Sequence, residues 1–509
     1  MPTDLSLETA EQSRWRLRPA FSKIDWFDNS VRNEFLSADE QRARQQESVR
    51  NLIARVAERV PYYRALLKRL HLTADDIQGM EDLVALPVLS REEVQEHSAD
   101  LRPEKIEHGA RPFAHMHTSG STGKPVTVAV ARGALEMLAV LKQREWRWFR
   151  FDPAGRFGAI RTATDLPKFG GKALAKPGET VQFPFWPLVG MYFVTGPFIG
   201  YSNRNPLEAQ AAWLRQQRPD YLLMQAAELE HLALQFADDG RELGLRGCLA
   251  ISQQLTQEMR RRIERTFGVQ VQENYGLNEV GLVATRCPEG QRYHIHTENC
   301  LVEIVDSLGM PCRPGEWGRI LVTSFANAAM PLLRYDADDL AEVADGPCPC
   351  GRTLPTFAAL RGRYRRTALL PPGTWEYWIA FQTALYYLPP EVARALRQYQ
   401  LHQYRDGNFE LRLVVANPLS EQFEATVRKY WGEAKEQTPP PLRIVTVAEI
   451  PLAKGGKFQN FTSDFAPLFA DDTAGADFEA RAARSLRLRR QRTMSTSCPS
   501  GQLARYDRG

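Results

Sequence analysis

Hydrophobic and polar residues alternate with helical spacing over the N-terminal part of the chain. Ser37 and Glu40 form a capping-box pattern ahead of a long amphipathic run that continues to Val60. Ser90 and Glu93 repeat the pattern in the segment LSREEVQEH. In a capping box the two side chains accept hydrogen bonds from each other's backbone, which marks the start of a helix. The sequence therefore predicts that this part of the chain is helical.

The middle of the chain alternates short apolar runs with segments of helical periodicity. From Asp220 to Gly276 these are DYLLMQ, AAELEHLALQFADDG, LRGCLAISQ, LTQEMRRRIERTFG and VQVQENYG. Two more strand-like segments follow, CLVEIVD and GRILVTSF, and we expect the first to end in a turn at residues 307–309. This alternation is typical of a mostly parallel sheet covered by helices. The predicted fold class is therefore α/β.

The pattern changes after Arg363. A loop at LLPPGTWEYW, a hairpin signal at Asp406-Gly407, a helix over 421–433 and a strand at LRIVTVAEI lead into PLAKGGKFQNF. These elements predict a small α+β domain of about a hundred residues. We therefore divide the chain into a large N-terminal domain over 1–363, a small domain over 364–468 and a disordered basic tail over 469–509.

Composition and charge narrow the class of protein. The chain has 509 residues, 43% of them hydrophobic and 25% charged, with a formal net charge of +4. These values are ordinary for a globular protein and give no basic footprint for nucleic acid. Much of the positive excess lies in the arginine-rich tail, which we interpret as a solvated terminus.

One uncharged stretch, FPFWPLVGMYFVTGPFIGY at residues 183–201, has the length of a membrane span. Its repeated prolines and glycines would break a helix, so we expect a buried, turn-rich segment that walls an apolar ligand pocket. The chain opens with polar residues rather than a signal peptide, and its seven cysteines are unevenly spaced. Both features favour a cytoplasmic location without a disulfide framework.

A glycine- and hydroxyl-rich run, TSGSTGKP at residues 118–125, is the first candidate for chemistry. It differs from a Walker loop, because only two residues separate its glycines and Pro125 follows Lys124. The period-2 alternation of PVTVAV predicts that a strand follows the run. Two interpretations remain open from these residues: a phosphate cradle built from backbone N–H groups, hydroxyls and an ammonium, or a polar turn.

Taken in order, several segments give the chain a resemblance to the adenylate-forming superfamily, specifically its phenylacetate–CoA ligase-like branch. The matching segments span roughly residues 40–465 and are VPYYRALL, PVLSREEV, TSGSTGKP, ENYGLNEVG, RYDADDL, CPCGR, LRGR and GGKF. The resemblance implies a large N-terminal adenylation domain with helix-covered, mostly parallel sheets and a small barrel. It also implies a small, mobile C-terminal lid domain.

The resemblance implies an ATP- and Mg²⁺-dependent enzyme that converts a carboxylic acid to an acyl-adenylate and then transfers it to a thiol. Coenzyme A is the expected acceptor, and an aromatic or apolar acid is the expected substrate. The family's acidic hinge and glycine loop are absent after Arg363, where Tyr364-Arg365-Arg366 stand instead. A carrier-protein thiol, an amine acceptor or a catalytically inactive nucleotide-binding relative therefore remain as alternatives.

The same resemblance assigns roles to residues of the nucleotide site. Tyr275 would stack on adenine beside Gly276, and Glu279 would hold Mg²⁺ next to Asn278, where the family usually has serine or threonine. One carboxylate is chemically sufficient for Mg²⁺ because this ion keeps few protein ligands. The loop residues would bind the β- and γ-phosphates; they are Thr118, Ser119, Gly120, Ser121, Thr122, Gly123 and Lys124.

Further assignments come from the later segments. Asp339 would accept both ribose hydroxyls, although Asp338 precedes it where the family usually has glycine. Ser252, followed by two glutamines, stands where the family has a small, glycine-containing strand end that faces the nucleotide. Arg363 would be the arginine before the hinge. Lys457 would be the catalytic lid lysine that bridges the substrate carboxylate and the α-phosphate.

A second group of residues suggests a structural metal. Cys287, His294, Cys348 and Cys350 stand in segments that recur in this branch, and three thiolates with an imidazole are a common tetrahedral zinc set. His296 lies on the same face of the expected strand as His294, so either histidine could be the ligand. Four protein ligands leave no open position, which predicts a structural Zn²⁺.

Overall fold

The computed structural model describes the chain in segments. They are residues 24–105, 112–117, 126–162, 166, 178–236, 239–253, 255–306, 308–361, 374–389, 392, 395–434, 438–451 and 458–465. The basic tail that we expect to be disordered lies outside these residues, as do the TSGSTGKP run, Arg363 and Lys457. The predicted domain boundaries therefore stay a prediction, although the elements on either side of residue 363 can be compared.

The N-terminal part is helical, as its periodicity predicts. Ser37 caps one helix and accepts a hydrogen bond from Glu40 N, and Ser90 caps another and accepts from Glu93 N; both capping boxes are complete. The elements are α1 (Ile24–Asn33), α2 (Ala38–Arg59), α3 (Pro61–Arg69), the 3₁₀ turns η1 (Ala74–Asp76) and η2 (Met80–Ala85), and α4 (Arg91–Glu96).

A twelve-stranded sheet runs through the large part of the molecule, in the order β11-β12-β13-β14-β10-β9-β8-β7-β6-β3-β5-β4. Its parallel half is β5 (Phe198–Ser202), β3 (Phe157–Arg161), β6 (Tyr221–Gln225), β7 (Gly247–Ile251) and β8 (Val271–Leu277), with β4 (Val181–Phe183) antiparallel at the edge. The expected parallel arrangement is confirmed for these strands. Their apolar residues are almost all buried because helices cover them.

The helices that accompany this half are α5 (Arg132–Trp148), α6 (Leu207–Gln217), α7 (Ala226–Gln235) and α8 (Gln257–Phe267), with 3₁₀ turns η3 (Val189–Met191) and η4 (Gly240–Leu243). Along the chain α6 follows β5, α7 follows β6 and α8 follows β7, whereas α5 precedes β3. Every residue of α7 from Ala226 to Leu234 is buried. A helix that is buried on all sides has neighbours on both its sheet face and its outer face, and the outer neighbour is the C-terminal unit.

The other half of the sheet is antiparallel, and β8 joins the two halves. The first part of β8 pairs parallel with β7, and its last residues pair antiparallel with β9. The antiparallel strands are β9 (Gly281–Arg286), β10 (Tyr293–Ile295), β11 (Cys300–Val305), β12 (Trp317–Ser324), β13 (Tyr335–Val343) and β14 (Thr356–Arg361). A separate hairpin of β1 (Pro112–His117) and β2 (Thr127–Ala131) flanks the TSGSTGKP run, which confirms the strand expected after it.

The uncharged stretch over 183–201 is turn-rich and contains no long helix. Its buried Trp186 ring lies 5.1 Å from that of Phe157, at the amino end of β3, and 5.1 Å from that of Trp146 on α5, between ring centroids. The Trp186 indole also donates a hydrogen bond to Gly155 O over 2.9 Å. These rings belong to one buried apolar cluster. That the segment also walls a ligand pocket stays a prediction. No helix among the described residues is long and apolar enough to cross a membrane.

The C-terminal unit, residues 374–465, has a four-stranded sheet in the order β17-β16-β15-β18. Its elements are α10 (Thr374–Tyr387), β15 (Leu396–Gln403), β16 (Phe409–Val415), α12 (Glu421–Glu433), β17 (Leu442–Thr446) and β18 (Phe461–Ser463). The hairpin at Gly407, the helix over 421–433 and the strand at LRIVTVAEI are confirmed. The predicted loop at LLPPGTWEYW is wrong in its second half, because α10 begins at Thr374 and buries Tyr377 and Trp378.

Candidate active site

Three polar segments meet where β8 ends and β13 begins. Tyr275, near the end of β8, is buried and donates a hydrogen bond from its hydroxyl to Asp339 Oδ2 over 2.8 Å. Burial raises the pKa of Tyr275 well above its usual range, and the Asp339 carboxylate acts in the same direction. The hydroxyl therefore stays protonated and donates. Gly276 and Asn278 are exposed beside this pair.

Asp339 lies on an irregular part of β13. The register between β12 and β13 shifts between Arg319 and Leu321, so β13 bulges around residues 336–340. Asp338 adopts a left-handed conformation with φ of +60°, and Asp336 Oδ1 accepts a hydrogen bond from its backbone N–H over 2.9 Å. Aspartate tolerates this conformation better than most residues because its side chain bonds locally. The chain thus forms, with Asp338, the turn for which the family uses glycine.

Glu279 lies two residues after the end of β8 and is 6% exposed. Its Oε1 accepts hydrogen bonds from Tyr335 OH over 2.9 Å and from Arg91 Nη1 over 3.3 Å. No hydrogen bond to its second oxygen, Oε2, is formed within the part of the chain that the structure describes. One oxygen is thus fixed by two donors, and the other is left as an acceptor.

Arg91 and Tyr335 were not among the predicted site residues. Both lie inside segments that carry the family resemblance, PVLSREEV and RYDADDL, and this is the signal that could have found them. The two segments are joined by backbone: Leu89 N donates to Arg334 O over 3.0 Å, and Asp336 N donates to Leu89 O over 3.0 Å. This short pairing brings α4, and with it Arg91, to Glu279.

Ser252 lies at the carboxyl end of β7, next to the end of β8. It is exposed and left-handed, with φ of +66°. This conformation favours glycine, which agrees with the glycine-containing form of the family at this place. The next residue, Gln253, accepts a hydrogen bond from Ala227 N over 3.1 Å and donates one to Phe458 O. The strand end therefore touches the residue that follows Lys457 in the sequence.

The remaining predicted residues of the nucleotide site, 118–124, Arg363 and Lys457, lie outside the described residues. One adjoining residue is described for the run, His117, and one for Lys457, Phe458. β1 and β2 pair antiparallel up to His117 and Thr127, so the run at 118–125 begins and ends at the same end of this hairpin. Phe458 follows Lys457 and is 1% exposed.

The cysteine and histidine residues form a compact cluster at the carboxyl end of β9, where Cys287 follows the strand. Ligand atoms of Cys287, His294, Cys348 and Cys350 all lie within 4.8 Å of one another. Cys350 Sγ is 3.3 Å from His294 Nε2. The backbone at Gly290 packs closely against this cluster. A Cβ on Gly290 would lie 2.1 Å from Cys348 Sγ, so only glycine fits there.

The structure separates the two candidate histidines. His294 Nε2 faces the thiols, and its Nδ1 lies 3.3 Å from Leu354 O. His296 instead contacts Arg144 through Nδ1 and lies 2.9 Å from Thr285 Oγ1 through Nε2. Burial, with Arg144 adding to it, lowers the pKa of His296 well below its usual range. His294 is therefore the ligand candidate, and His296 belongs to a buried polar network behind it.

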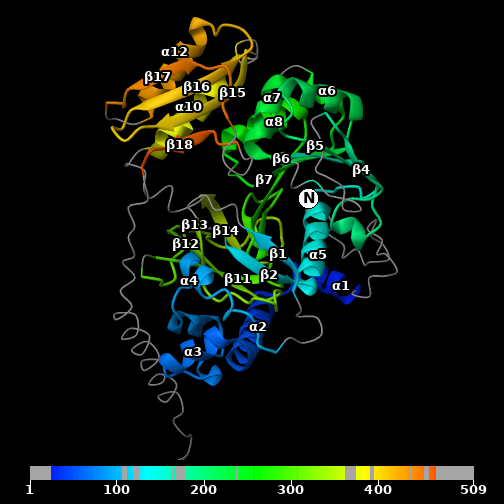
Figure 1. The fold of residues 1–509 in the computed structure, drawn as a ribbon, viewed down its shortest axis with the longest axis vertical. Helices are drawn as coiled ribbons and strands as arrows, with labels where there is room; N and C mark the ends of the chain where they lie inside the picture. The colour runs from blue at the N-terminus through cyan, green and yellow to red at the C-terminus, as the bar shows by residue number, and fades with distance from the viewer. Residues whose placement is uncertain are drawn as a thin grey trace, which may run out of the picture.

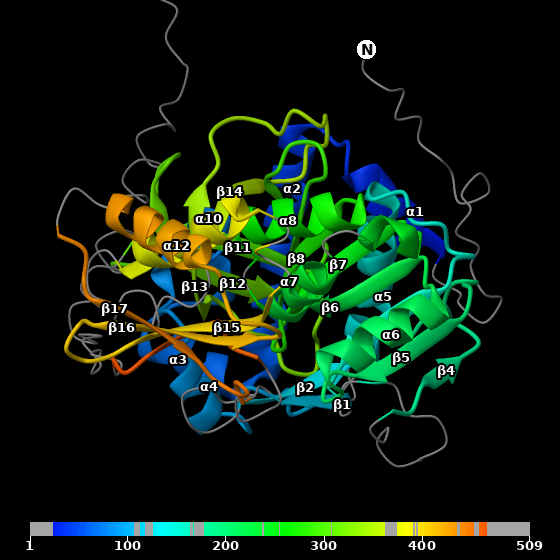
Figure 2. The ribbon, with the colours of Figure 1, turned by 90° about the horizontal axis from the view of Figure 1, so that it is seen from above.

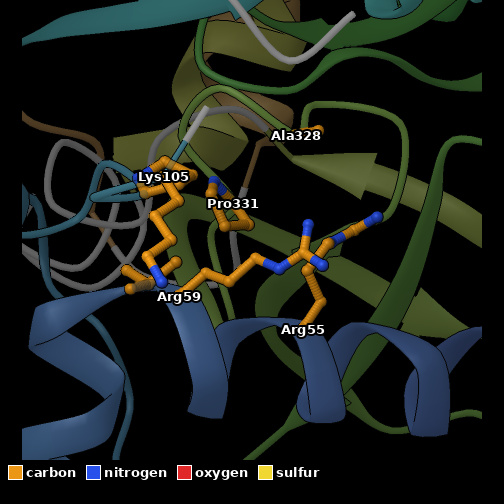
Figure 3. Close-up of a pocket in the computed structure, with 7 residues that line it drawn as sticks. Arg55, Arg59, Lys105, Ala328 and Pro331 are labelled. Atoms are coloured by element: carbon orange, nitrogen blue, oxygen red, sulfur yellow. The ribbon is translucent and has the colours of Figure 1, made fainter. Parts of the chain in front are cut away.

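Two surface hollows have basic linings. One, of about 40 Å³, is lined by Arg55, Arg59 and Lys105 around Pro331 (Figure 3). The other, of about 320 Å³, is lined by Arg260, Arg261 and Arg286 near the amino end of β8. Neither hollow is lined by Tyr275, Glu279 or Asp339. Polar groups and strand ends, rather than cavity size, define the candidate site.

The fold is shared with a solved acyl-CoA ligase. The chain superposes on a crystal structure of 2-hydroxyisobutyryl-CoA ligase in the postadenylation state in complex with 2-HIB-AMP, with a TM-score of 0.64 and 15% sequence identity. That match covers 90% of this chain and 94% of the other. The chain therefore has the fold of adenylate-forming acyl-CoA ligases.

The chain is also similar in sequence to named CoA ligases. The chain is 28% identical over 397 residues to a phenylacetate–coenzyme A ligase of Thermus thermophilus, covering 76% of this chain and 84% of that protein. It is 27% identical over 340 residues to a phenylacetate–coenzyme A ligase of Escherichia coli, covering 65% and 72%. No protein-family model matches the chain. The chain is thus a homologue of phenylacetate–CoA ligases, which confirms the resemblance read from its sequence.

Proposed function

We propose that the protein is an ATP- and Mg²⁺-dependent ligase that activates a carboxylic acid as an acyl-adenylate and transfers the acyl group to coenzyme A. The observation that supports this best is the meeting of YGLNE, RYDADDL and PVLSREEV at the end of β8 and the start of β13, a place that we call the carboxylate edge. The contact between Tyr275 and Asp339, and that between Arg91 and Glu279, join them. The relative from Thermus thermophilus is named phenylacetate–coenzyme A ligase and aligns over 84% of its length.

Two displacement steps make up the proposed reaction. A carboxylate oxygen of the acid attacks the α-phosphorus of ATP, and pyrophosphate leaves with the electron pair of the broken P–O bond. The thiol sulfur then attacks the carbonyl carbon of the adenylate, loses its proton and expels AMP. The protein's part is to hold the reacting groups in place and to neutralise phosphate charge.

The proposed roles follow from where the residues lie. Asp339, held by the Tyr275 hydroxyl, has the acceptor-only carboxylate that two ribose hydroxyls require. Ser252, Gly276 and Asn278 are exposed around that edge, where a nucleotide can reach them. Residues 118–124 would contact the phosphates, and Arg363 would be the arginine before the hinge. Lys457 would bridge the substrate carboxylate and the α-phosphate.

Glu279 fits the proposed Mg²⁺. Magnesium prefers carboxylate oxygen and retains several waters, so one side chain is enough. Tyr335 and Arg91 fix Oε1 of Glu279, which orients Oε2 for a cation. When bound, Mg²⁺ supplies charge neutralisation for the triphosphate.

We also propose that the Cys287–His294–Cys348–Cys350 cluster holds a structural Zn²⁺. The support is its donor set, three sulfur atoms and one imidazole nitrogen that converge within 4.8 Å. Elemental analysis by ICP of protein purified without added metal is expected to find about one zinc per chain. Protein that folds and contains no zinc would contradict the assignment.

The proposed acid is phenylacetate or a related aromatic acid, on the strength of the relatives' names. The test is ATP–pyrophosphate exchange with a panel of aromatic and aliphatic acids. We expect exchange with at least one aromatic acid and none without acid. Absence of exchange with every acid of the panel, in folded and metal-replete protein, would count against acid activation.

Lys457→Ala supplies the matched variant for this assay. It is expected to abolish exchange while leaving ATP binding nearly unchanged, because the lysine acts on the transferring phosphate. Equal exchange by variant and wild type would remove the lysine from the reaction. The acceptor is settled by supplying coenzyme A or an amine with the activated acid: a thioester supports the proposal, and an amide alone would favour the amide-ligase alternative.

A further inference from the structure

The C-terminal unit is held against the large part of the molecule by α7 and α8. It lies beside these helices at the top of Figure 1, and Figure 2 shows α10 next to α8 in the view from above. Ile450 and Phe458 are buried in the same apolar cluster as residues of α7 and α8. In return, Leu234 of α7 is buried among rings of the C-terminal unit. The two parts thus share apolar surface in this pose.

Gln253 makes a polar bridge across this contact. Its side-chain oxygen accepts from Ala227 N at the start of α7 over 3.1 Å, and its side-chain N–H donates to the carbonyl oxygen of Phe458. An amide side chain is suited to this task because it carries an acceptor and a donor on one rigid group. Both functions are in use, so the orientation of Gln253 is fixed.

His231, on α7, packs against the ring of Phe458. The imidazole meets the Phe458 ring edge to face at 4.9 Å and the Tyr399 ring at 5.1 Å. Burial lowers the pKa of His231 to about 3, and Arg262 adds to this. The imidazole is therefore neutral at physiological pH and can pack against two aromatic rings without the cost of a buried charge.

Tyr399 completes the contact through its hydroxyl, which donates to Glu230 Oε2 on α7. The same hydroxyl oxygen accepts from Gln382 Nε2 over 3.1 Å and from Asn460 Nδ2 over 3.3 Å. Arg262 Nε lies 3.3 Å from Glu230 Oε1, without the alignment of a hydrogen bond. A buried carboxylate thus depends on a hydroxyl from the C-terminal unit, and Asn460, two residues beyond Phe458, joins the same network.

We propose that Gln253 is a positioning residue for acid activation: it holds the backbone of Phe458 at the carboxyl end of β7 and thereby delivers Lys457 to the nucleotide. Lys457 is joined to Phe458 by one peptide bond, so an anchor on the Phe458 backbone acts directly beside the lysine. Gln253 itself is next to Ser252, at the edge where Tyr275 lies. This inference rests on the proposed function of Lys457 and adds the residue that sets its place.

The inference predicts a split between the two half-reactions. Gln253→Ala is expected to lower kcat for ATP–pyrophosphate exchange about tenfold, while KM for ATP stays within about twofold, because one bond that orients the lysine is lost. Transfer from a supplied acyl-adenylate to coenzyme A does not need this lysine and is expected to keep its wild-type rate. Equal loss in both half-reactions, or no loss in exchange, would overturn the inference.

Two further variants separate positioning from general damage. Gln253→Glu keeps an acceptor for Ala227 N but places carboxylate oxygen against the Phe458 carbonyl, so exchange is expected to fall at least as far as in Gln253→Ala. Gln257→Ala removes an exposed glutamine on α8, four residues away, and is expected to behave as wild type. Wild-type exchange rates in Gln253→Glu would rule out the donor bond.

A readout without catalysis keeps this inference distinct from the proposed function. Amide hydrogen exchange of residues 458–463 is expected to be faster in Gln253→Ala than in wild type, because their attachment to β7 is weakened. Unchanged exchange in this segment would refute the docking role even if activity falls. If the wild-type protein activates no acid, the proposed function fails, and the hydrogen-exchange measurement still decides whether Gln253 holds Phe458.

Discussion

The cysteine–histidine cluster and the carboxylate edge are both built from short polar motifs, but their side chains are held in different ways. In the cluster, four donor atoms converge on one point and His294 is oriented from behind by Leu354 O. At the edge, Tyr275 holds Asp339, while Arg91 and Tyr335 hold one oxygen of Glu279. The first arrangement brings four possible metal ligands together, whereas the second fixes two carboxylates that we propose act on a nucleotide and its Mg²⁺.

Backbone conformation separates the two regions further. Ser252, Arg334 and Asp338, all at the edge, are left-handed without being glycine. Such conformations cost of order 1 kcal/mol each and persist where surrounding contacts impose them. Arg334, for example, is buried and donates to Leu86 O over 2.7 Å and Gly309 O over 2.9 Å. Strain of this kind is typical of sites that position a ligand.

The largest effect is expected at Glu279. Glu279→Ala removes the proposed Mg²⁺ ligand and the partner of Arg91, so acid-dependent pyrophosphate exchange is expected to fall about a thousandfold. Glu279→Gln keeps an acceptor for Tyr335 and loses only the charge, so it is expected to fold normally and to need far more Mg²⁺. Exchange rates measured across a magnesium titration test both variants.

The matched control is Glu273→Gln, at the other end of β8. Glu273 is also a buried carboxylate paired with an arginine, at 2.7 Å from Arg260, but it lies away from the nucleotide edge. Its loss is expected to lower the melting temperature without changing the magnesium requirement. A similar magnesium response in both glutamine variants would show that ion pairing, not metal binding, is what Glu279 provides.

The cluster is expected to respond in stability rather than in chemistry. Cys350→Ser removes one of the four proposed ligands, so zinc content should drop well below one per chain and the free energy of unfolding should fall by about 3 kcal/mol. Denaturant unfolding and elemental analysis measure the two quantities. Cys312→Ser, a free thiol outside the cluster, is the control and should retain zinc. Full zinc retention in Cys350→Ser would exclude that thiol as a ligand.

Much of the fold was predictable because it follows from local patterns. The capping boxes at Ser37 and Ser90, the hairpin at Gly407 and the helix over 421–433 depend on neighbouring residues alone. The loop predicted at LLPPGTWEYW failed where tertiary packing decided the outcome. Tyr377 and Trp378 become helical because they are buried against the C-terminal sheet, a contact no local pattern reveals.

The site was predictable in its motifs but not in its internal contacts. Glu279 and Asp339 stand out in the sequence, whereas the donors that hold them, Arg91 and Tyr275, come from segments far away along the chain. The choice between His294 and His296 also needed the structure, since spacing alone places both on one face. Residues 118–124 and Lys457 remain predictions from the sequence.

A smaller effect is expected from Tyr275→Phe. The substitution keeps the ring and removes the hydrogen bond to Asp339, which is worth about 1 kcal/mol. We expect KM for ATP to rise about fivefold with kcat nearly unchanged, because the carboxylate is oriented for the ribose in both ground and transition states. Steady-state kinetics with varied ATP provide the measurement. Burial raises the pKa of Tyr275 well above its usual range. The pH profile of kcat/KM for the wild-type enzyme should therefore show no ionisation of Tyr275 up to the ordinary pKa of tyrosine.

The smallest effect is expected at Ser252, where backbone strain and hydroxyl chemistry can be separated. Ser252→Gly relieves the left-handed conformation and should raise the free energy of unfolding by less than about 1 kcal/mol, after the greater flexibility of glycine in the unfolded chain is deducted. Ser252→Ala removes the hydroxyl but not the strain, so it should not stabilise. Thermal unfolding of the two variants compares them directly. If glycine destabilises the protein and raises KM for ATP as much as alanine does, then the serine hydroxyl itself binds the nucleotide. The departure from the family's glycine would in that case be a contact that this chain has gained.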